Sequence, residues 1–224
     1  MAPREPLRTH PREDAPLLVV PPTVSSLDRR DSAEASALLI AAYHDDPLLF
    51  TLVPDDRRRL RVAEWVMRPV MREVMEHGLA DGAWVDGRLI GIALWMPPGT
   101  YPTPSRHRLK ETAATLGLGR IVGLGARRIA RSLVSMDRAH PRGPHWYLWF
   151  VGVAMAQRGM GVGSRLIEAG LARIDAEQEA AYTETFTERT AGLLERAGFE
   201  PTGELALGAD LAPGRKLWRP ARIR

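Results

Sequence analysis

The chain contains no cysteine and no asparagine among its 224 residues. Without cysteine there are no disulfides, no thiolate metal ligands and no cysteine nucleophile, so acyl transfer through a cysteine-bound intermediate is excluded. Apolar runs are short as well, since none approaches the roughly 20 residues that cross a bilayer. The run at Leu17–Val20 stops at Pro21-Pro22 and is too short for a signal peptide. We therefore expect a soluble, cytoplasmic protein without a membrane segment.

Charge and length are those of an ordinary globular chain. The formal net charge is only +4, and much of the basic excess lies at residues 106–131 and 215–224. Aromatic residues are not interleaved with these arginines as base stacking would require, so we expect a solvated surface and no nucleic-acid partner. Residues 1–16 are rich in proline and charge, which predicts a disordered tail. Residues 17–224 suit a single domain with a helical insert at about 101–141.

The most informative stretch is a strand, a turn and a helix in direct succession. Residues Trp146–Val153 are β-branched and aromatic, which favours a buried strand, and from Ser164 onward apolar residues recur at helical spacing. The turn between them has glycine at alternate positions, at Gly159, Gly161 and Gly163. Backbone N–H groups can approach a ligand closely where Cβ atoms are missing, and a helix N-terminus carries partial positive charge. The turn therefore suits a phosphate or pyrophosphate.

The spacing of the glycines narrows the choice of ligand. The Walker pattern fails because its Gly-Lys is absent, and the dinucleotide fingerprint fails because the third glycine comes one residue early. The pattern that remains, R-x-x-G-x-G at Arg158–Gly163, resembles the coenzyme A pyrophosphate loop of the GCN5-related N-acetyltransferases (GNAT). A glycine-rich turn that binds nothing is the alternative for this motif alone.

Other segments resemble the same family in the same order. They are Ala41–Pro47 at the end of its first helix, Gly82–Pro98 in a β-hairpin, Tyr182–Thr185 in its fifth strand, and Leu193–Glu200 after that strand. Together they resemble the puromycin N-acetyltransferase-like branch over about residues 24–220.

This resemblance implies an α/β (α+β) fold, with a central mixed, mostly antiparallel twisted sheet that is splayed at the coenzyme site and flanked by helices. It implies acetyl-CoA as co-substrate and no metal. The main chain of Val151, Gly152 and Val153 would hold the pantetheine arm, with an N–H facing the thioester oxygen. The remaining expected coenzyme contacts are Arg158, Gly159, Met160, Gly161, Val162, Gly163, Ser164 and Thr190.

Three residues are candidates for the general base. Glu184 in the expected fifth strand would lie beside the coenzyme arm, where a half-buried carboxylate could take a proton from an ammonium group. It could equally be structural and bond backbone or an arginine. His44 and Asp46 follow the first helix, which borders the acceptor cleft in this fold, and histidine titrates near neutrality. A helix-end histidine more often only interacts with the helix dipole.

Aromatic residues are the candidates for the acceptor pocket. We expect Tyr43, Tyr147 and Trp149 to line it together with Glu184, although strand aromatics are also common in cores. His145 follows a proline at the start of a strand, and we expect it at the surface.

Periodicity and turn residues predict the other elements. These are a strand at Leu17–Val24, a helix from the Asp31 cap to Asp46, a helical region at Asp55–His77 with a break or kink at Pro69, a hairpin at Ala83–Met96 turned by Asp86-Gly87, two helices within 101–141, a strand at Ala181–Phe186, a helix at Arg189–Ala197 and a final hairpin at Leu205–Trp218.

The chain departs from the family at two points. Leu193-Leu194 replaces a Phe-Tyr pair whose tyrosine protonates the coenzyme thiolate, and Thr187–Thr190 replaces a segment whose asparagine helps to hold the coenzyme. The thiolate could collect its proton from water, or the hydroxyl of Tyr182 or Thr190 could serve.

We expect an acetyl-CoA-dependent N-acetyltransferase that transfers acetyl directly to an amine of a small molecule. An antibiotic or aminonucleoside is one possible acceptor, and a peptide N-terminus is another. The protein would be a monomer or a homodimer. The alternative is a non-catalytic acyl-CoA-binding or regulatory protein that lost the acid at Leu194.

Overall fold

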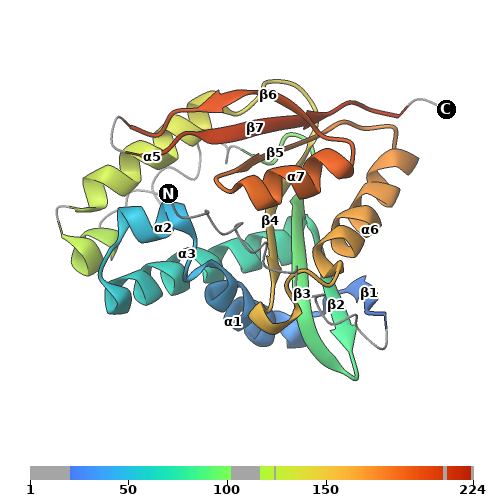
Figure 1. Ribbon diagram of the computed structural model, residues 1–224, viewed down its shortest axis with the longest axis horizontal. Coiled ribbons are helices and arrows are strands. Elements are labelled where there is room, and N and C mark those ends of the chain that lie inside the picture. The colour runs from blue at the N-terminus through green and yellow to red at the C-terminus, as the bar shows by residue number, and fades with distance from the viewer. Residues whose placement is uncertain (1–20, 102–116, 124, 209–210, 223–224) are drawn as a thin grey trace, which may run out of the picture.

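A seven-stranded sheet with the strand order β1-β2-β3-β4-β5-β7-β6 forms the centre of the molecule (Figure 1). It is seen in a computed structural model that describes residues 21–101, 117–123, 125–208 and 211–222. All neighbouring strands are antiparallel except β4 and β5, which are parallel. The strands are β1 Thr23–Ser26, β2 Leu79–Val85, β3 Arg88–Met96, β4 Trp146–Val153, β5 Ala181–Thr185, β6 Glu200–Leu205 and β7 Gly214–Arg219. The predicted mixed, mostly antiparallel sheet is confirmed.

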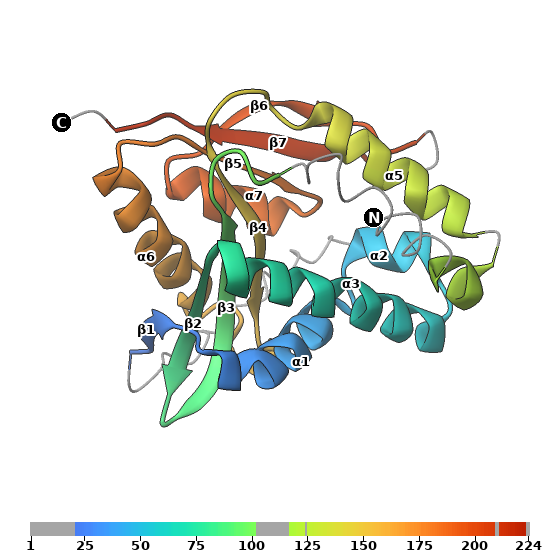
Figure 2. The ribbon, with the colours of Figure 1, turned by 180° about the vertical axis from the view of Figure 1, so that it is seen from behind.

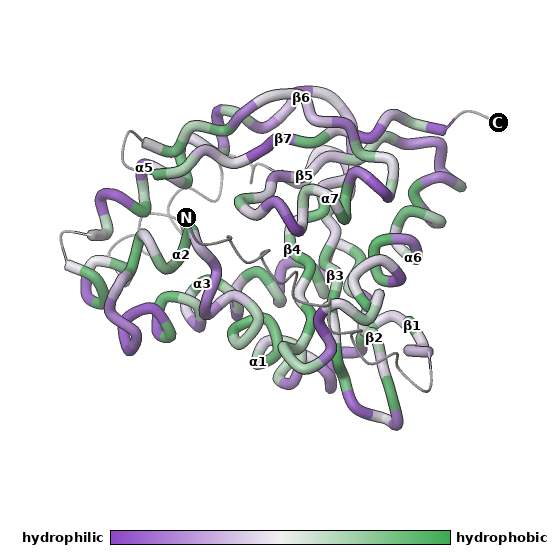
Figure 3. The backbone as a smooth tube through the Cα atoms, in the orientation of Figure 1, coloured by the Kyte–Doolittle hydropathy of each residue, from purple (hydrophilic) through white to green (hydrophobic). Residues whose placement is uncertain are grey.

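Helices cover both faces of this sheet (Figures 1 and 2). One face packs on α1 (Ser32–Tyr43) and α3 (Asp56–His77), and the other packs on α6 (Val162–Ala176) and α7 (Glu188–Arg196). The remaining elements are η1 Arg29–Asp31, α2 Pro47–Leu52, α5 Gly125–Ala139 and η3 Met155–Gln157. Hydropathy follows these layers, with apolar segments toward the sheet and polar segments outward (Figure 3). No helix within the described ranges is long and apolar enough to span a membrane.

Local signals placed several elements correctly. The β2–β3 turn has positive φ at Asp86 (48°) and Gly87 (73°), the geometry that an Asp-Gly hairpin requires. Helix α3 ends at Gly78 as expected, and it continues through Pro69, so of the predicted break or kink only the break is excluded. The final hairpin pairs Glu200–Leu205 with Gly214–Arg219, which makes its first strand earlier and its loop longer than predicted.

Asp46 begins a separate helix instead of ending the first one. Helix α1 stops at Tyr43, and α2 starts at Pro47 with the Asp46 carboxylate accepting from the N–H groups of Leu48 (3.0 Å) and Leu49 (3.1 Å). Proline fits the first position of a helix because its missing N–H would have had no partner there. Burial raises the pKa of Asp46, and the two N–H donors only partly offset that effect.

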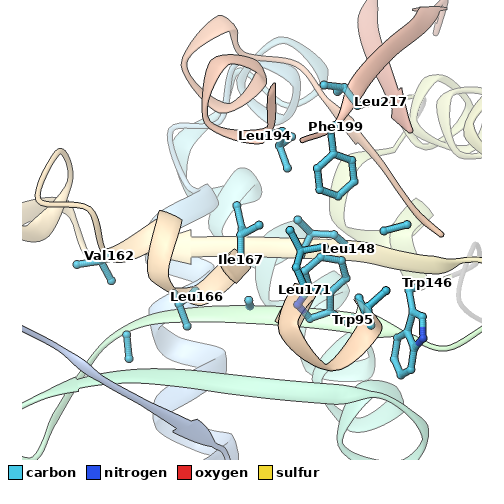
Figure 4. Packing of buried hydrophobic residues seen from close by; sticks show 14 of the residues in the cluster. Trp95, Trp146, Leu148, Val162, Leu166, Ile167, Leu171, Leu194, Phe199 and Leu217 are labelled. Carbon is cyan, nitrogen blue, oxygen red and sulfur yellow. The ribbon is translucent and has the colours of Figure 1, made fainter. Parts of the chain in front are cut away.

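Close packing between α6 and β3 depends on Gly170. A Cβ there would lie 2.4 Å from Nε1 of Trp95, which is fully buried under this helix. Trp95 belongs to the apolar cluster on the α6/α7 face of the sheet (Figure 4).

Gly170→Ala is expected to destabilise the protein by about 1–3 kcal/mol, because the added methyl group forces the Trp95 indole out of place. Urea unfolding measures the effect. Gly192→Ala in α7 is the matched control, since its Cβ meets only the end of the Arg196 side chain at 3.5 Å. This control should gain about 0.5–1 kcal/mol from helix propensity. Equal effects of the two substitutions would contradict the packing.

Asp46→Ala should cost about 1 kcal/mol, because two helix N–H groups lose their cap, whereas Asp46→Asn keeps a cap without the buried charge. The pKa of Asp46 in the folded protein lies above the usual 3.8, so the protonated carboxyl is favoured by folding and the carboxylate is not. This contribution to stability is complete below pH 3.8 and is lost as the pH rises through the folded pKa. The Asn variant should therefore gain on the wild type as the pH rises above 3.8, measured by urea unfolding at a series of pH values. A pH-independent difference would show that burial does not act on this carboxyl.

Candidate active site

Strands β4 and β5 lie side by side only at their starts and then diverge. They pair at Trp146 with Ala181 and at Tyr147 with Tyr182. Just beyond these pairs, the Thr183 hydroxyl donates to the carbonyl of Leu148 at 2.9 Å. The Leu148 carbonyl is therefore bonded to a side chain of β5. We call the diverging segments, residues 148–153 of β4 and 183–185 of β5, the fork. The edge of β4 that faces β5 is therefore unpaired along the fork.

The hydrogen bonding of β4 shows which main-chain groups face the fork. The N–H of Ala154 donates to the carbonyl of Ile90 at 2.9 Å, so this residue faces β3. Successive residues of an antiparallel strand turn their N–H and C=O groups to opposite sides. Gly152 therefore also faces β3, and the main-chain groups of Val151 and Val153 face the fork. These are two of the three residues predicted to hold a pantetheine arm.

The end of α1 is tied to this free edge by two side chains. The Tyr43 hydroxyl donates to the Val151 carbonyl at 3.2 Å. Arg158 donates from Nε to the Val153 carbonyl at 3.3 Å and from Nη2 to the Ala42 carbonyl at 2.9 Å. The guanidinium of Arg158 thus anchors the loop to β4 and α1. Gly152 permits the close approach of α1, because a Cβ there would lie 3.1 Å from Leu39 and 3.2 Å from Ala42.

The glycine-rich loop follows the fork directly. After η3, Gly159 (φ 87°) and Gly161 (φ 79°) adopt the left-handed conformation, and Gly161 is the N-cap residue of α6. A Cβ on Gly161 would have no atom within 4 Å, so the N-terminus of α6 faces open space. Val162 is buried in the core and Gly163 lies against Leu193. The Val162 side chain fixes the start of the helix in the core, and Ser164 lies in its first turn.

A bulge in β4 orients an aromatic group beside the fork. Leu94 pairs with Phe150 and Trp95 pairs with Leu148, so Trp149 is the extra residue in β4. The Trp149 ring lies 6.3 Å from that of Tyr147 and 5.3 Å from that of Tyr101, between ring centroids.

Glu184 lies in β5 among these rings. Its side chain is only 6% exposed. Burial, and next the Glu184 carboxylate, raise the pKa of Tyr147 well above its usual value, and the same two causes raise the pKa of Tyr182. The two tyrosine rings stack with centroids 6.0 Å apart. The fold therefore brings together three predicted residues, Tyr147, Trp149 and Glu184.

Two buried histidines beside Glu184 were missed or misplaced by the sequence reasoning. His145 was expected at the surface, yet it is 5% exposed because its ring packs on Tyr182 and Trp218. Its Nε2 lies 3.0 Å from Nε2 of His140, the residue after α5, and Nδ1 of His140 lies 3.9 Å from Oε1 of Glu184. The spacing of His140 and His145 carries no recognised motif, so only the fold reveals the pair.

The other two base candidates have structural partners. His44 lies 2.9 Å from Asp45 through Nδ1 and 3.2 Å from Asp56 through Nε2, which joins the end of α1 to the start of α3. Asp46 caps α2.

The position of the expected acid lies in the core. Leu194 is 1% exposed and packs with Phe199 and Leu217 on the α6/α7 face (Figure 4). Thr190, in the first turn of α7, accepts a hydrogen bond at Oγ1 from Oγ1 of Thr187 at 2.8 Å. Across the described ranges, no three His, Asp or Glu residues form a group that could hold a metal ion.

Comparison with known proteins agrees with this geometry. The family model for the acetyltransferase (GNAT) family matches residues 43–199. An uncharacterized N-acetyltransferase of Schizosaccharomyces pombe is 26% identical over 185 residues, which cover 77% of this chain and 72% of the relative.

Two solved structures share the fold. One, from Corynebacterium glutamicum, is described as a histone acetyltransferase HPA2 and related acetyltransferase; it has a TM-score of 0.67 and 28% identity and covers 92% of this chain and 99% of its own. A mosquito arylalkylamine N-acetyltransferase-like protein has a TM-score of 0.63 and 17% identity over 88% of this chain and 99% of its own. The chain belongs to the GNAT family of acetyltransferases, which use acetyl-CoA.

Proposed function

We propose that the protein transfers the acetyl group of acetyl-CoA directly to an amine of a small molecule. The observation that carries this proposal is the unpaired edge of β4, which leads straight into the glycine-rich start of α6. An extended arm can add to such an edge as a strand would, while a diphosphate binds at the N-terminus of the helix. Acetyl-CoA has both parts in that order and supplies an activated acetyl thioester.

The residues of the fork have distinct roles in this proposal. The N–H groups of Val151 and Val153 hold the arm, and one of them faces the thioester oxygen as it gains charge. The N–H groups of Gly159 and of residues 161–164 hold the diphosphate, while the N–H of Met160 donates to the Gln157 carbonyl at 3.4 Å. Arg158 keeps the loop in place through the carbonyls of Val153 and Ala42.

An amine is the acceptor that the other side of the fork fits best. Glu184 is a buried carboxylate bordered by the rings of Tyr147 and Tyr182, which suits an ammonium group through charge and cation–π contact. We assign Glu184 as the general base in preference to His44 and Asp46, since those two are bonded to the starts of α3 and α2. Tyr147 and Trp149 line the acceptor side, and Tyr43 supports the coenzyme edge through Val151.

The close packing of aromatic rings on the acceptor side of the fork indicates the class of amine that would bind there. Rings of Tyr101, Tyr147 and Trp149 lie within 4.9–6.3 Å of one another, which suits a compact amine such as an arylalkylamine or an aminonucleoside antibiotic. The resemblance to the puromycin-modifying branch supports an aminonucleoside antibiotic as the acceptor. This acceptor stays a prediction.

A second function is favoured by Leu194, which cannot donate a proton. In this second function the protein binds acyl-CoA but does not catalyse a reaction. Thiol release from acetyl-CoA distinguishes the two functions when it is followed with phenethylamine, agmatine, puromycin and a peptide with a free N-terminus. We expect turnover with a small amine. Acetyl-CoA binding without turnover on any of these amines would instead support the second function.

Gly161→Ala is expected to weaken acetyl-CoA binding about tenfold or more, because a side chain disfavours the φ of 79° that aims the helix N–H groups. Gly87→Ala at the hairpin tip is the matched control, with a φ of 73° and, as at Gly161, no atom within 4 Å of its Cβ. Calorimetry with acetyl-CoA measures both variants. Both should lose similar stability and only the first should lose affinity; wild-type affinity in Gly161→Ala would place the diphosphate elsewhere.

A further inference from the structure

His140 is a buried histidine with one ring nitrogen unused. Its side chain is 1% exposed, and its Nδ1 has no hydrogen-bond partner among the described residues. Leaving a buried polar atom unpaired is destabilising. The nearest acidic group is the Glu184 carboxylate, 3.9 Å away and itself 6% exposed. The unused nitrogen therefore points to a function at the acceptor side of the fork.

The hydrogen bonds of His145 fix which nitrogen of His140 carries the proton. Nδ1 of His145 lies 3.0 Å from the Gly143 carbonyl, which can only accept, so this nitrogen carries a hydrogen. Burial, and next His140, lower the pKa of His145 and favour its neutral form, in which Nε2 is an acceptor. His140 must then donate from Nε2 across the 3.0 Å contact. Its Nδ1 is left with a lone pair on the side of Glu184.

The surroundings of His140 hold it in this orientation. The rings of Tyr147 (4.9 Å, 82°), Tyr182 (5.1 Å, 83°) and Tyr101 (4.8 Å, 63°) meet it edge to face. The titratable and charged groups around it are His145 before β4, Tyr147 on β4, Tyr182 and Glu184 on β5, Tyr101 after β3, and Asp137 on α5, which accepts from the Tyr101 hydroxyl. Arg138 and Arg142 line the pocket of about 860 Å³ that His140 and Tyr101 border. Glu184 is the acidic group nearest to Nδ1.

We propose that His140 and Glu184 act as a coupled proton acceptor for the acetyl-accepting amine, with His145 as the residue that fixes the tautomer of His140. This inference rests on the function proposed above. An N–H bond of the bound ammonium breaks and an O–H bond forms at the Glu184 carboxylate. That proton then passes to Nδ1 of His140, which becomes an imidazolium, and the carboxylate is regenerated beside it. Separations such as 3.9 Å between catalytic partners commonly shorten when substrate binds.

The His140–Glu184 pair provides a proton acceptor that a single buried carboxylate would lack. A carboxylic acid formed in an apolar site would have to lose its proton to water that the bound substrates exclude. A neutral imidazole with a free Nδ1 next to it can accept the proton, and the ion pair that results is stabilised by the closeness of its two charges. The lone pair is available because His145 holds the other nitrogen.

Side-chain ¹⁵N NMR of histidine tests the arrangement without any acceptor substrate. At neutral pH we expect His145 to carry its hydrogen on Nδ1 and His140 to carry its hydrogen on Nε2. On acidification His140 should take its proton at Nδ1. A neutral His140 with the hydrogen on Nδ1 would overturn the proposal.

Two variants test the coupling in the same spectra. Glu184→Gln should lower the pH at which His140 titrates, because the carboxylate that stabilises the imidazolium is gone. Glu188→Gln is the matched control, since Glu188 is exposed on α7 and pairs with Arg215. An unchanged His140 midpoint in Glu184→Gln would contradict the coupling.

Kinetics with the amine that is turned over test the role in catalysis. His140→Gln should lower kcat by about 10²-fold and move the acid limb of the pH profile to lower pH, while acetyl-CoA affinity by calorimetry stays unchanged. His77→Gln, an exposed histidine at the end of α3, should change none of these. A fall in rate with the wild-type pH profile would mean a structural role and overturn the proposal. If no amine is turned over, the proposed function fails, whereas the NMR result still decides the His140–Glu184 coupling.

Discussion

The structure depends on the loss of pairing between β4 and β5. β3 and β7 pair along the outer sides of these strands, so the unpaired groups concentrate on one inner edge of β4. Unsatisfied main-chain groups are costly unless something meets them. The protein supplies donors for the carbonyls, from Tyr43 to Val151 and from Arg158 to Val153. The N–H groups of the same two residues also face the fork, where an extended ligand can bond them. The same contacts hold the end of α1, the edge of β4 and the loop together.

The two faces of the sheet differ in what they bury. On the α6/α7 face, an apolar cluster that includes Leu166, Ile167 and Leu194 gives the loop and its helix a rigid base. On the other face, aromatic rings enclose a buried carboxylate and two histidines beside the fork. Buried polar groups are stabilising only when they are mutually satisfied. Nδ1 of His140 and the Tyr182 hydroxyl are the buried polar atoms of that cluster without a hydrogen-bond partner among the described residues, and Nδ1 lies 3.9 Å from the Glu184 carboxylate.

The sequence predicted what depends on neighbouring residues. The strand–loop–helix unit, the Asp-Gly hairpin and the helix end at Gly78 all follow from local turn chemistry, and the structure has them. Contacts between distant segments were not predictable: Tyr43 reaches Val151 across 108 residues, and Glu184 meets His140 through the order of the strands. His145 follows a proline and resembles a loop residue, but the rings of Tyr182 and Trp218 bury it. The tail at 1–16 and part of the predicted insert lie outside the described residues.

Leu194 cannot donate a proton, but this does not exclude catalysis. The side chain packs with Phe199 and Leu217, so this position strengthens the base of the loop, although the family resemblance implies a tyrosine here. Tyr182 is a poor substitute donor, because burial and Glu184 raise its pKa. A general acid typically contributes about 10²–10⁴-fold, whereas enzymes accelerate their reactions by roughly 10⁶-fold or more. A thiol with an ordinary pKa of about 8.5 can also leave as the thiolate. In the proposed mechanism, positioning at the fork and proton removal at Glu184 do not require the missing hydroxyl, so its loss would lower the rate without removing either step.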